Sequence, residues 1–159
     1  MSKNIVEMKE IIEKYSNTVY RVALTRTKSI ENAEDIFQEV FLKLSEKNPH
    51  FESEEHTKAW LIRVTINLTK NFHRSSWNQK VTSLEEDISF ETKEESDVIE
   101  KVNELPQNYR TVIYLFYYEG YKIKEISELL KKNEGTIKTW LSRAREALKE
   151  KLEGGFEDE

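Results

Sequence analysis

Residues 122–152 read KIKEISELLKKNEGTIKTWLSRAREALKEKL, a stretch that predicts two helices joined by a tight turn near residues 131–135. Apolar residues recur at helical spacing on both sides of the turn. They are Ile123, Ile126, Leu129 and Leu130 in the first helix, and Ile137, Leu141, Ala144, Leu148 and Leu152 in the second. The other face of the second helix carries cations and hydroxyls: Lys138, Thr139, Ser142, Arg143, Arg145 and Lys149.

This two-faced second helix has the properties needed to enter a DNA groove. Its apolar face would dock on the first helix, while cations neutralise phosphates and short polar side chains reach base edges. An ordinary pair of amphipathic helices with a solvated charged face produces the same pattern. The segment by itself leaves both interpretations open.

The composition predicts a helical protein with small cores. Of 159 residues, 35% are charged and 37% hydrophobic, and there are only four Gly and two Pro. The absence of Cys excludes a disulfide framework and a thiolate metal site. No apolar run is long enough to span a membrane, so we expect a cytoplasmic protein.

The net charge of −5 conceals blocks of opposite sign. Residues 56–80 hold five bases and no acid, and residues 136–152 hold five bases and two acids. Residues 81–104 hold nine acids and two bases, and the last seven residues add four acids. The chain therefore has two separate basic surfaces, and its acid lies mainly between and after them.

Periodicity predicts three helices before the acidic block. Their apolar stripes are Ile5, Met8, Ile12, Tyr15, Val19 and Val22; then Ala33, Ile36, Phe37, Val40, Phe41 and Leu44; then Trp60, Leu61, Val64, Leu68 and Phe72. Asn32 is the expected cap of the second helix, which should end before Asn48 and Pro49. Arg63, Asn67, Lys70 and Arg74 line another face of the third helix.

After the acidic block, three helices form a second domain. Residues 81–97 are acidic, rich in Ser and Thr, and lack sustained periodicity, so they predict a flexible linker. Leu105 and Pro106 open a helix that Gly120 ends, and the helix pair of residues 122–152 follows. The predicted fold is all-α, with two small helical domains joined by a flexible acidic linker.

Four segments in order, AEDIFQEVFLKL, KAWLIRVTINLTKNF, LPQNYRTVIYLFYYEGYKIKEISELL and EGTIKTWLSRAREALKEKL, resemble the extracytoplasmic-function (ECF) sigma factors of bacterial RNA polymerase. The resemblance implies a sigma region 2-like helical bundle at residues 1–80 and an acidic linker at 81–104. It implies a region 4-like helix-turn-helix domain at 105–153, followed by an acidic tail at 154–159. The expected function is to bring core RNA polymerase to promoters and to promote melting of the DNA.

The resemblance also implies roles for individual residues. Asp35, Gln38 and Glu39 match the face that binds core polymerase, although a solvated acidic face is the plainer interpretation of the residues alone. Arg63, Asn67, Lys70 and Arg74 match the surface for the minus-10 element, and the loop at residues 51–57 matches one that helps hold a flipped base. Lys138, Thr139, Ser142 and Arg143 match minus-35 contacts, with Thr136 and Arg145 on phosphates.

Trp140 departs from the family pattern, because many relatives carry a cation at this position. Its ring would either pack on the preceding helix or rest against sugar and thymine methyl groups. Family members commonly bind an anti-sigma factor, so we expect such a partner besides core polymerase and promoter DNA.

Two other classes of function compete with the sigma-factor interpretation. A stand-alone helix-turn-helix regulator explains residues 122–152 equally well, but it leaves the second basic helix unexplained. An enzyme or metal protein would have to use the acidic loop that contains His50, Glu52, Glu54, Glu55 and His56. That loop lacks zinc-helix spacing, and no glycine-rich phosphate cradle accompanies it. We therefore predict no enzyme activity, no cofactor and no metal.

Overall fold

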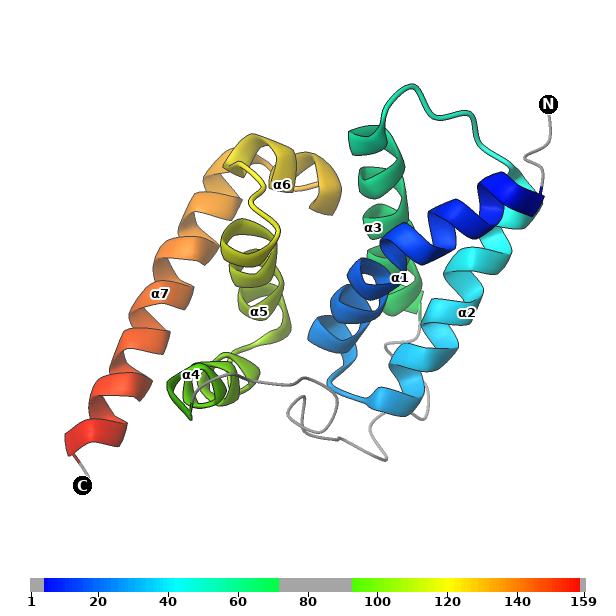
Figure 1. The fold of residues 1–159 in the computed structure, drawn as a ribbon. Helices are drawn as coiled ribbons and strands as arrows, with labels where there is room; N and C mark the ends of the chain where they lie inside the picture. Colours follow the sequence, from blue (N-terminus) through cyan, green and yellow to red (C-terminus); the bar gives the residue numbers. More distant parts are fainter. Residues whose placement is uncertain (1–4, 72–92, 158–159) are drawn as a thin grey trace. The chain divides into compact units, whose positions relative to one another are not determined.

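The computed structural model describes residues 5–71 and 93–157, with side chains placed for residues 7–70 and 97–153. All the secondary structure in these described ranges is helical, which confirms the predicted all-α fold (Figure 1). The chain divides into two compact units, Met1–Val81 and Thr82–Glu159.

The first unit contains α1 (Ile5–Thr27), α2 (Ile30–Lys47) and α3 (Glu54–Asn71), and each of these helices packs on the other two (Figure 1). Its most deeply buried residues are Val19, Val22, Ala23 and Leu24 of α1, Ala33, Ile36, Val40 and Leu44 of α2, and Leu61, Ile62 and Ile66 of α3. The stripe predicted for α2 supplies all four of its residues in this core, whereas the stripe predicted for α1 supplies Val19 and Val22 but not Ala23 and Leu24. Met8 and Ile12, near the start of α1, are only partly buried.

The buried face of α3 is rotated relative to the predicted one. Trp60 and Val64 are partly exposed, whereas Ile62 and Ile66 are fully buried. Phe72, the last residue of the predicted stripe, lies outside the described residues. The prediction for α3 was therefore wrong at two of its five positions, because it placed the buried stripe on Trp60 and Val64 and omitted Ile62 and Ile66.

Buried threonines account for the rotation. Thr65 and Thr69 are both fully buried. The Thr65 hydroxyl donates to the carbonyl of Leu61 at 2.7 Å, and the Thr69 hydroxyl donates to the carbonyl of Ile66 at 2.6 Å. A hydroxyl that bonds the preceding helical turn leaves only its methyl group to pack, so a threonine can occupy a core position.

Ser29, and not Asn32, caps α2. The Ser29 side chain accepts a hydrogen bond from the Asn32 backbone N–H at 3.2 Å, so the sequence prediction of Asn32 as the cap was wrong. Lys28 has a left-handed backbone (φ 57°), and this turn between α1 and α2 is only two residues long. The turn brings the Ser29 hydroxyl over the exposed amides of the first turn of α2.

The second unit contains α4 (Lys93–Asn103), α5 (Gln107–Ile113), a π-helix η4 (Tyr114–Tyr118), α6 (Ile123–Leu130) and α7 (Glu134–Glu157). The predicted bounds of α6 agree with the structure. Gly120 (φ 77°) follows the π-helix and adopts a left-handed conformation that suits glycine. The helix α7 continues to Glu157, into the segment predicted as an acidic tail.

The helix α4 occupies residues that the sequence analysis assigned to the linker, so the linker prediction was wrong for residues 93–103. The helix packs on α5 and α7. Val98 and Val102, four residues apart, line a groove with Leu148 and Leu152 of α7. The apolar positions of α4 are too few to stand out among its acids, but they are spaced as a helix needs.

The connection between α4 and α5 is held by a buried arginine. Arg110 is 7% exposed, and its Nη1 donates to the carbonyl of Leu105 at 2.7 Å. Burial lowers the pKa of Arg110 to about 10, so the guanidinium stays charged at neutral pH.

Replacing Ser29 by Ala should destabilise the first unit by about 1 kcal/mol, because the amides at the start of α2 lose their side-chain acceptor. Urea unfolding of the full chain, followed by circular dichroism, measures this loss. Ser45→Ala makes the same chemical change at an exposed position within α2 and should leave the free energy of unfolding almost unchanged. Equal effects of the two substitutions would contradict the assignment of Ser29 as the cap.

Candidate nucleic-acid interface

The turn between α6 and α7 is short and fixed by specific backbone features. Lys131 adopts a left-handed conformation (φ 55°) directly after α6. Asn133 then caps α7, because its Oδ1 accepts a hydrogen bond from the Thr136 backbone N–H at 2.7 Å. The predicted turn at residues 131–135 is therefore slightly shorter in the structure, and Gly135 already lies in the first turn of α7.

The helix α7 has two distinct faces. Ile137, Leu141 and Ala144 are essentially fully buried, and α7 packs on α5, α6 and α4. The opposite face exposes four of the predicted DNA-contacting residues, namely Lys138, Thr139, Ser142 and Arg143. Within the described part of the chain, these four side chains form no hydrogen bond or ion pair. They are therefore available to a partner.

Arg145 is in a different situation from the other cations of this face. Its Nε donates a hydrogen bond to the hydroxyl of Tyr117. Its guanidinium lies 5.3 Å from the ring centre of Phe116 and 5.5 Å from that of Tyr117. Arg145 thus ties α7 to the π-helix, a contact that the sequence did not reveal because Tyr117 is 28 residues away.

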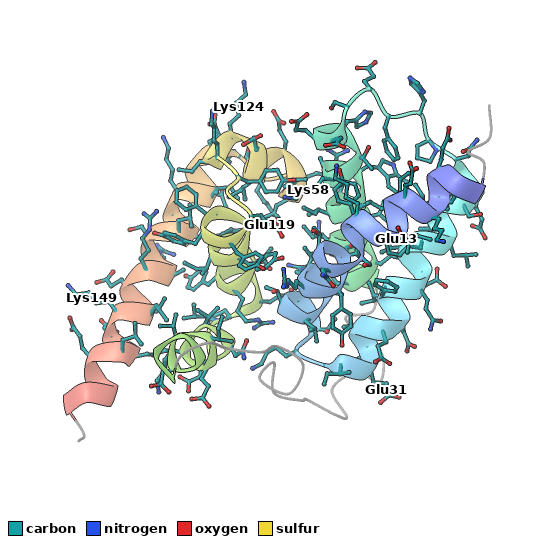
Figure 2. The ribbon with its side chains drawn as sticks, in the orientation of Figure 1. Glu13, Glu31, Lys58, Glu119, Lys124 and Lys149 are labelled. Carbon is teal, nitrogen blue, oxygen red and sulfur yellow. The ribbon has the colours of Figure 1, made fainter. Side chains whose placement is uncertain are left out.

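The exposed face of α7 changes sign along its length. After Arg143, the exposed residues include the acids Glu146, Glu150 and Glu153. Lys149 points away from the ribbon (Figure 2) and forms an ion pair of 3.9 Å with Glu153. From residue 136 to residue 143 the helix rises about 10 Å. The surface suited to phosphates is therefore confined to the N-terminal part of α7.

Thr136 and Trp140 border this surface. Thr136 is partly exposed, and its backbone N–H is used by the cap of α7. Trp140 is also partly exposed, so the ring has a packed part and an open part. The two roles considered for Trp140, packing and contact with DNA, both remain compatible with this position.

A second polar surface lies on α3 in the first unit. Arg63 and Asn67 are partly exposed and Lys70 is exposed. Their spacing of four and then three residues places them along one side of the helix. Arg74, the fourth predicted residue, lies outside the described residues. On the neighbouring side, the buried Arg26 of α1 donates from Nε to Thr69 Oγ1 at 3.0 Å and so attaches α3 to α1.

The loop predicted at residues 51–57 is only partly a loop, because α3 already begins at Glu54. The ring of Phe51 packs edge-on against His56 at 5.4 Å and against Trp60 at 5.7 Å, measured between ring centres. The start of α3 is tied to α1, since Lys14 forms an ion pair with Glu54 and the Tyr15 hydroxyl donates to the Glu54 carbonyl at 3.3 Å. Burial raises the pKa of the Tyr15 phenol.

A third surface lies on α2. The predicted polymerase-binding residues Asp35, Gln38 and Glu39 are all exposed. Leu42, which the sequence analysis did not single out, is 52% exposed. It follows Gln38 by four residues and Glu39 by three, so it shares their face. The sequence signal for Leu42 was a large apolar residue lying outside the buried stripe of α2.

The acidic segment around residue 50 makes one local contact and one contact with α1. The Glu52 backbone N–H donates to Nδ1 of His56 at 3.3 Å, and Glu54 pairs with Lys14. The side chains placed by the structure include no group of three or more His, Cys, Asp or Glu residues suited to a metal ion. None of the helices in the described ranges combines the length and apolar composition that crossing a membrane requires.

Comparison with known proteins identifies the family. Residues 11–79 match Sigma-70 region 2, and residues 96–148 match Sigma-70, region 4. The ECF RNA polymerase sigma factor SigM of Bacillus subtilis is 32% identical over 94% of this chain and 98% of its own length. The chain belongs to the ECF sigma factors. SigW of the same organism is 29% identical, over 90% of this chain and 87% of SigW.

Solved structures share the fold of this sigma factor. The sigma factor RpoE of Bartonella quintana, crystallised with the anti-sigma factor NepR, is 23% identical, with a TM-score of 0.71 over 94% of this chain and 98% of RpoE. CnrH, in complex with the cytosolic domain of CnrY, is 17% identical, with a TM-score of 0.68 over 95% of this chain and 90% of CnrH.

Membership in this family establishes the general function. The protein is an ECF RNA polymerase sigma factor that directs transcription initiation, and it is not an enzyme in its own right. Its helix-turn-helix therefore works as part of a polymerase holoenzyme. The alternative of a stand-alone regulator is set aside, because both sigma regions are present in one chain.

Replacing Glu146 by Gln should strengthen binding of the sigma factor to duplex DNA about two- to fivefold at low salt. The carboxylate lies on the same exposed face as Arg143, and its removal reduces repulsion of phosphates. Fluorescence anisotropy with a labelled duplex measures the gain, which should shrink as added salt shortens the screening length.

The control is Glu13→Gln, which makes the same change of charge at an exposed position of α1 (Figure 2). It should alter duplex affinity much less than Glu146→Gln. Equal gains from both substitutions would show that net charge alone matters and that the position of the acid on α7 does not.

Proposed function

We propose that this sigma factor recognises promoters through two separate surfaces, one in each unit. The N-terminal part of α7 reads the minus-35 element as duplex. Lys138, Thr139, Ser142 and Arg143 support this proposal, because they are exposed, unengaged and held outward by the buried face of α7. Arg and Lys pair with guanine or phosphate, and hydroxyls reach either. Thr136, at the start of the helix, is placed to approach a phosphate.

The proposed role of α3 is to capture the minus-10 element during melting. Arg63, Asn67 and Lys70 form a row of two cations and one amide, and Arg74 would extend it. Cations suit the backbone of a separated strand, while an amide offers one donor and one acceptor to the edge of a single base. The attachment of Thr69 to Arg26 supports this proposal, since it fixes the helix beside the row.

The proposed site for core polymerase is the exposed face of α2. The exposed Leu42 follows Gln38 and Glu39 on this face and precedes the exposed Ser45 and Glu46, so the face combines an apolar centre with a polar margin. This is the usual composition of a protein interface. Asp35 lies one turn before Gln38.

We further propose that an anti-sigma factor regulates this protein in the cytoplasm, where RNA polymerase works. The support comes from the fold. RpoE and CnrH, which share it, were solved with the anti-sigma factor NepR and with the cytosolic domain of CnrY, respectively. The surfaces proposed for polymerase and DNA are the ones that such an inhibitor would cover.

In vitro transcription tests the proposed division of labour. Core bacterial RNA polymerase is combined with a promoter library, with and without the protein, and the start sites are sequenced. Starts that depend on the protein and share two spaced elements are expected, and they define the consensus. Protein-dependent starts that share only one element would contradict the proposal of two surfaces.

Arg143→Ala should weaken binding to minus-35 duplex by about 1 to 3 kcal/mol if the guanidinium reads a base, because a bidentate contact is lost. Asn67→Ala should leave this duplex affinity unchanged and slow formation of the open complex. Anisotropy with the duplex measures the first step, and permanganate reactivity of unpaired thymines in the holoenzyme complex measures the second.

Each substitution serves as the control for the other, since both lie at solvent-accessible helix positions where folding should be little affected. If both substitutions slowed melting and weakened duplex binding to the same extent, the two surfaces would not act separately. A uniform loss across DNA sequences for Arg143→Ala would assign this residue to a phosphate.

Leu42→Ser should weaken binding to core polymerase about three- to tenfold, because the centre of the α2 face loses its apolar contact. Leu42→Met keeps an apolar side chain of similar size and should retain the affinity. Competition against a labelled reference sigma factor for core polymerase measures both variants. Indistinguishable affinities for Ser and Met would place the polymerase contact elsewhere.

A further inference from the structure

We propose that Arg145 is a positioning residue that sets how α7 is presented to DNA, and that it does so through Tyr117 and Phe116 of the π-helix. This inference rests on the proposed reading of duplex by α7. It gives Arg145 a role different from the phosphate contact predicted from the sequence.

The geometry of the contact indicates that Arg145 holds α7 at a fixed position on the π-helix. The Nε of Arg145 donates to the Tyr117 hydroxyl, and its guanidinium lies over two rings at 5.3 and 5.5 Å. Those rings meet edge to face, with centres 5.0 Å apart and planes at 75°. Together they form a cradle for a planar cation. The position of the guanidinium is therefore set by the two rings and the Tyr117 hydroxyl, and only its Nη groups remain unengaged by the described residues.

The π-helix explains why two adjacent aromatic residues face the same cation. The Glu119 N–H donates to the Tyr114 carbonyl at 3.1 Å, five residues back, so the turn holds more residues than an α-turn. Tyr114 and Tyr118 stack on each other with ring centres 5.1 Å apart and planes at 15°. The other pair, Phe116 and Tyr117, is left to meet Arg145.

The position of Arg145 on α7 suits a contact that fixes the orientation of the helix. Arg145 follows Lys138 by seven residues and Ser142 by three, so it lies along one edge of the face proposed to contact DNA. The buried stripe fixes α7 against α6 and α5 along its other side. A contact at the edge resists rotation of the helix about its own axis, which would move every base-reading side chain together.

The test compares variants that separate charge from contact. Tyr117→Phe removes the hydrogen bond without changing any charge, and Tyr117 is 57% exposed, so folding should be preserved. Arg145→Lys keeps the charge but loses the planar fork and the Nε donor. Lys138→Ala removes an unengaged cation from the same face. The unaltered protein is first used to select its best duplex from a random library. Each variant, as the full chain, is then titrated with this duplex and with a second duplex that differs from it at one base pair.

Tyr117→Phe and Arg145→Lys should each reduce discrimination between the two duplexes about two- to fivefold, and the double variant should lose no more than the stronger single one. For both variants, the slope of the logarithm of the binding constant against the logarithm of the salt concentration should stay unchanged. Lys138→Ala should lower the magnitude of this slope by about one. A mere loss of stability would reduce the active fraction, not the discrimination ratio, and thermal unfolding of each variant checks this.

The proposal would be overturned if Arg145→Lys discriminated between the two duplexes as well as the unaltered protein does and Tyr117→Phe had no effect. Arg145 would then be assigned to a phosphate contact. A flattened salt slope for Arg145→Gln would lead to the same assignment. If instead Lys138→Ala and Arg143→Ala left duplex binding intact, the failure would lie in the proposed reading of DNA by α7.

Discussion

The burial of Ile137, Leu141 and Ala144 is the interaction on which the second unit depends. These residues are essentially inaccessible, and they hold α7 against its neighbours along one side. Because a helix repeats its faces every three to four residues, fixing this side also fixes the direction of Lys138, Ser142 and Arg143. Stability and presentation of the polar face are therefore consequences of the same packing.

Electrostatics in this chain is organised by position and not by total charge. The net charge is −5, yet the N-terminal part of α7 exposes cations and hydroxyls. Acids follow on the same helix, and more acids lie in residues 81–104. At physiological salt, charges farther apart than about 8 Å are largely screened from each other. An acidic protein can therefore offer locally positive surfaces to nucleic acid while its other surfaces are repelled.

The sequence predicted those features that depend on strong local periodicity. The bounds of α6, the apolar stripe of α2 and the exposure of Lys138 and Arg143 all follow from the spacing of apolar residues. Predictions failed where a polar residue has a local partner. Thr65 and Thr69 bury hydroxyls that bond their own helix, and Ser29 becomes a cap only because Lys28 adopts a left-handed turn.

Contacts between residues distant in the chain were also beyond the sequence. The helix α4 packs on α7, and Val98 and Val102 line a groove with Leu148 and Leu152. The eleven residues of α4 alone do not reveal this contact. The cradle of Phe116 and Tyr117 depends on an irregular turn, and propensities do not distinguish a π-turn from an α-turn. Leu42 is different, because its place outside the predicted stripe of α2 already indicated that it is exposed, and the structure confirms this exposure.

The ion pair between Glu104 and Lys151, 3.2 Å long, lies at the end of α4 and near the far end of α7. Residue 151 is about 27 Å along the helix axis from the cap at residue 133. The helix α4 thus lies against the C-terminal half of α7, at the opposite end from Lys138 and Arg143. The C-terminal half of α7 is therefore held by contacts with α4 that are separate from those that bury Ile137 and Leu141 near its start.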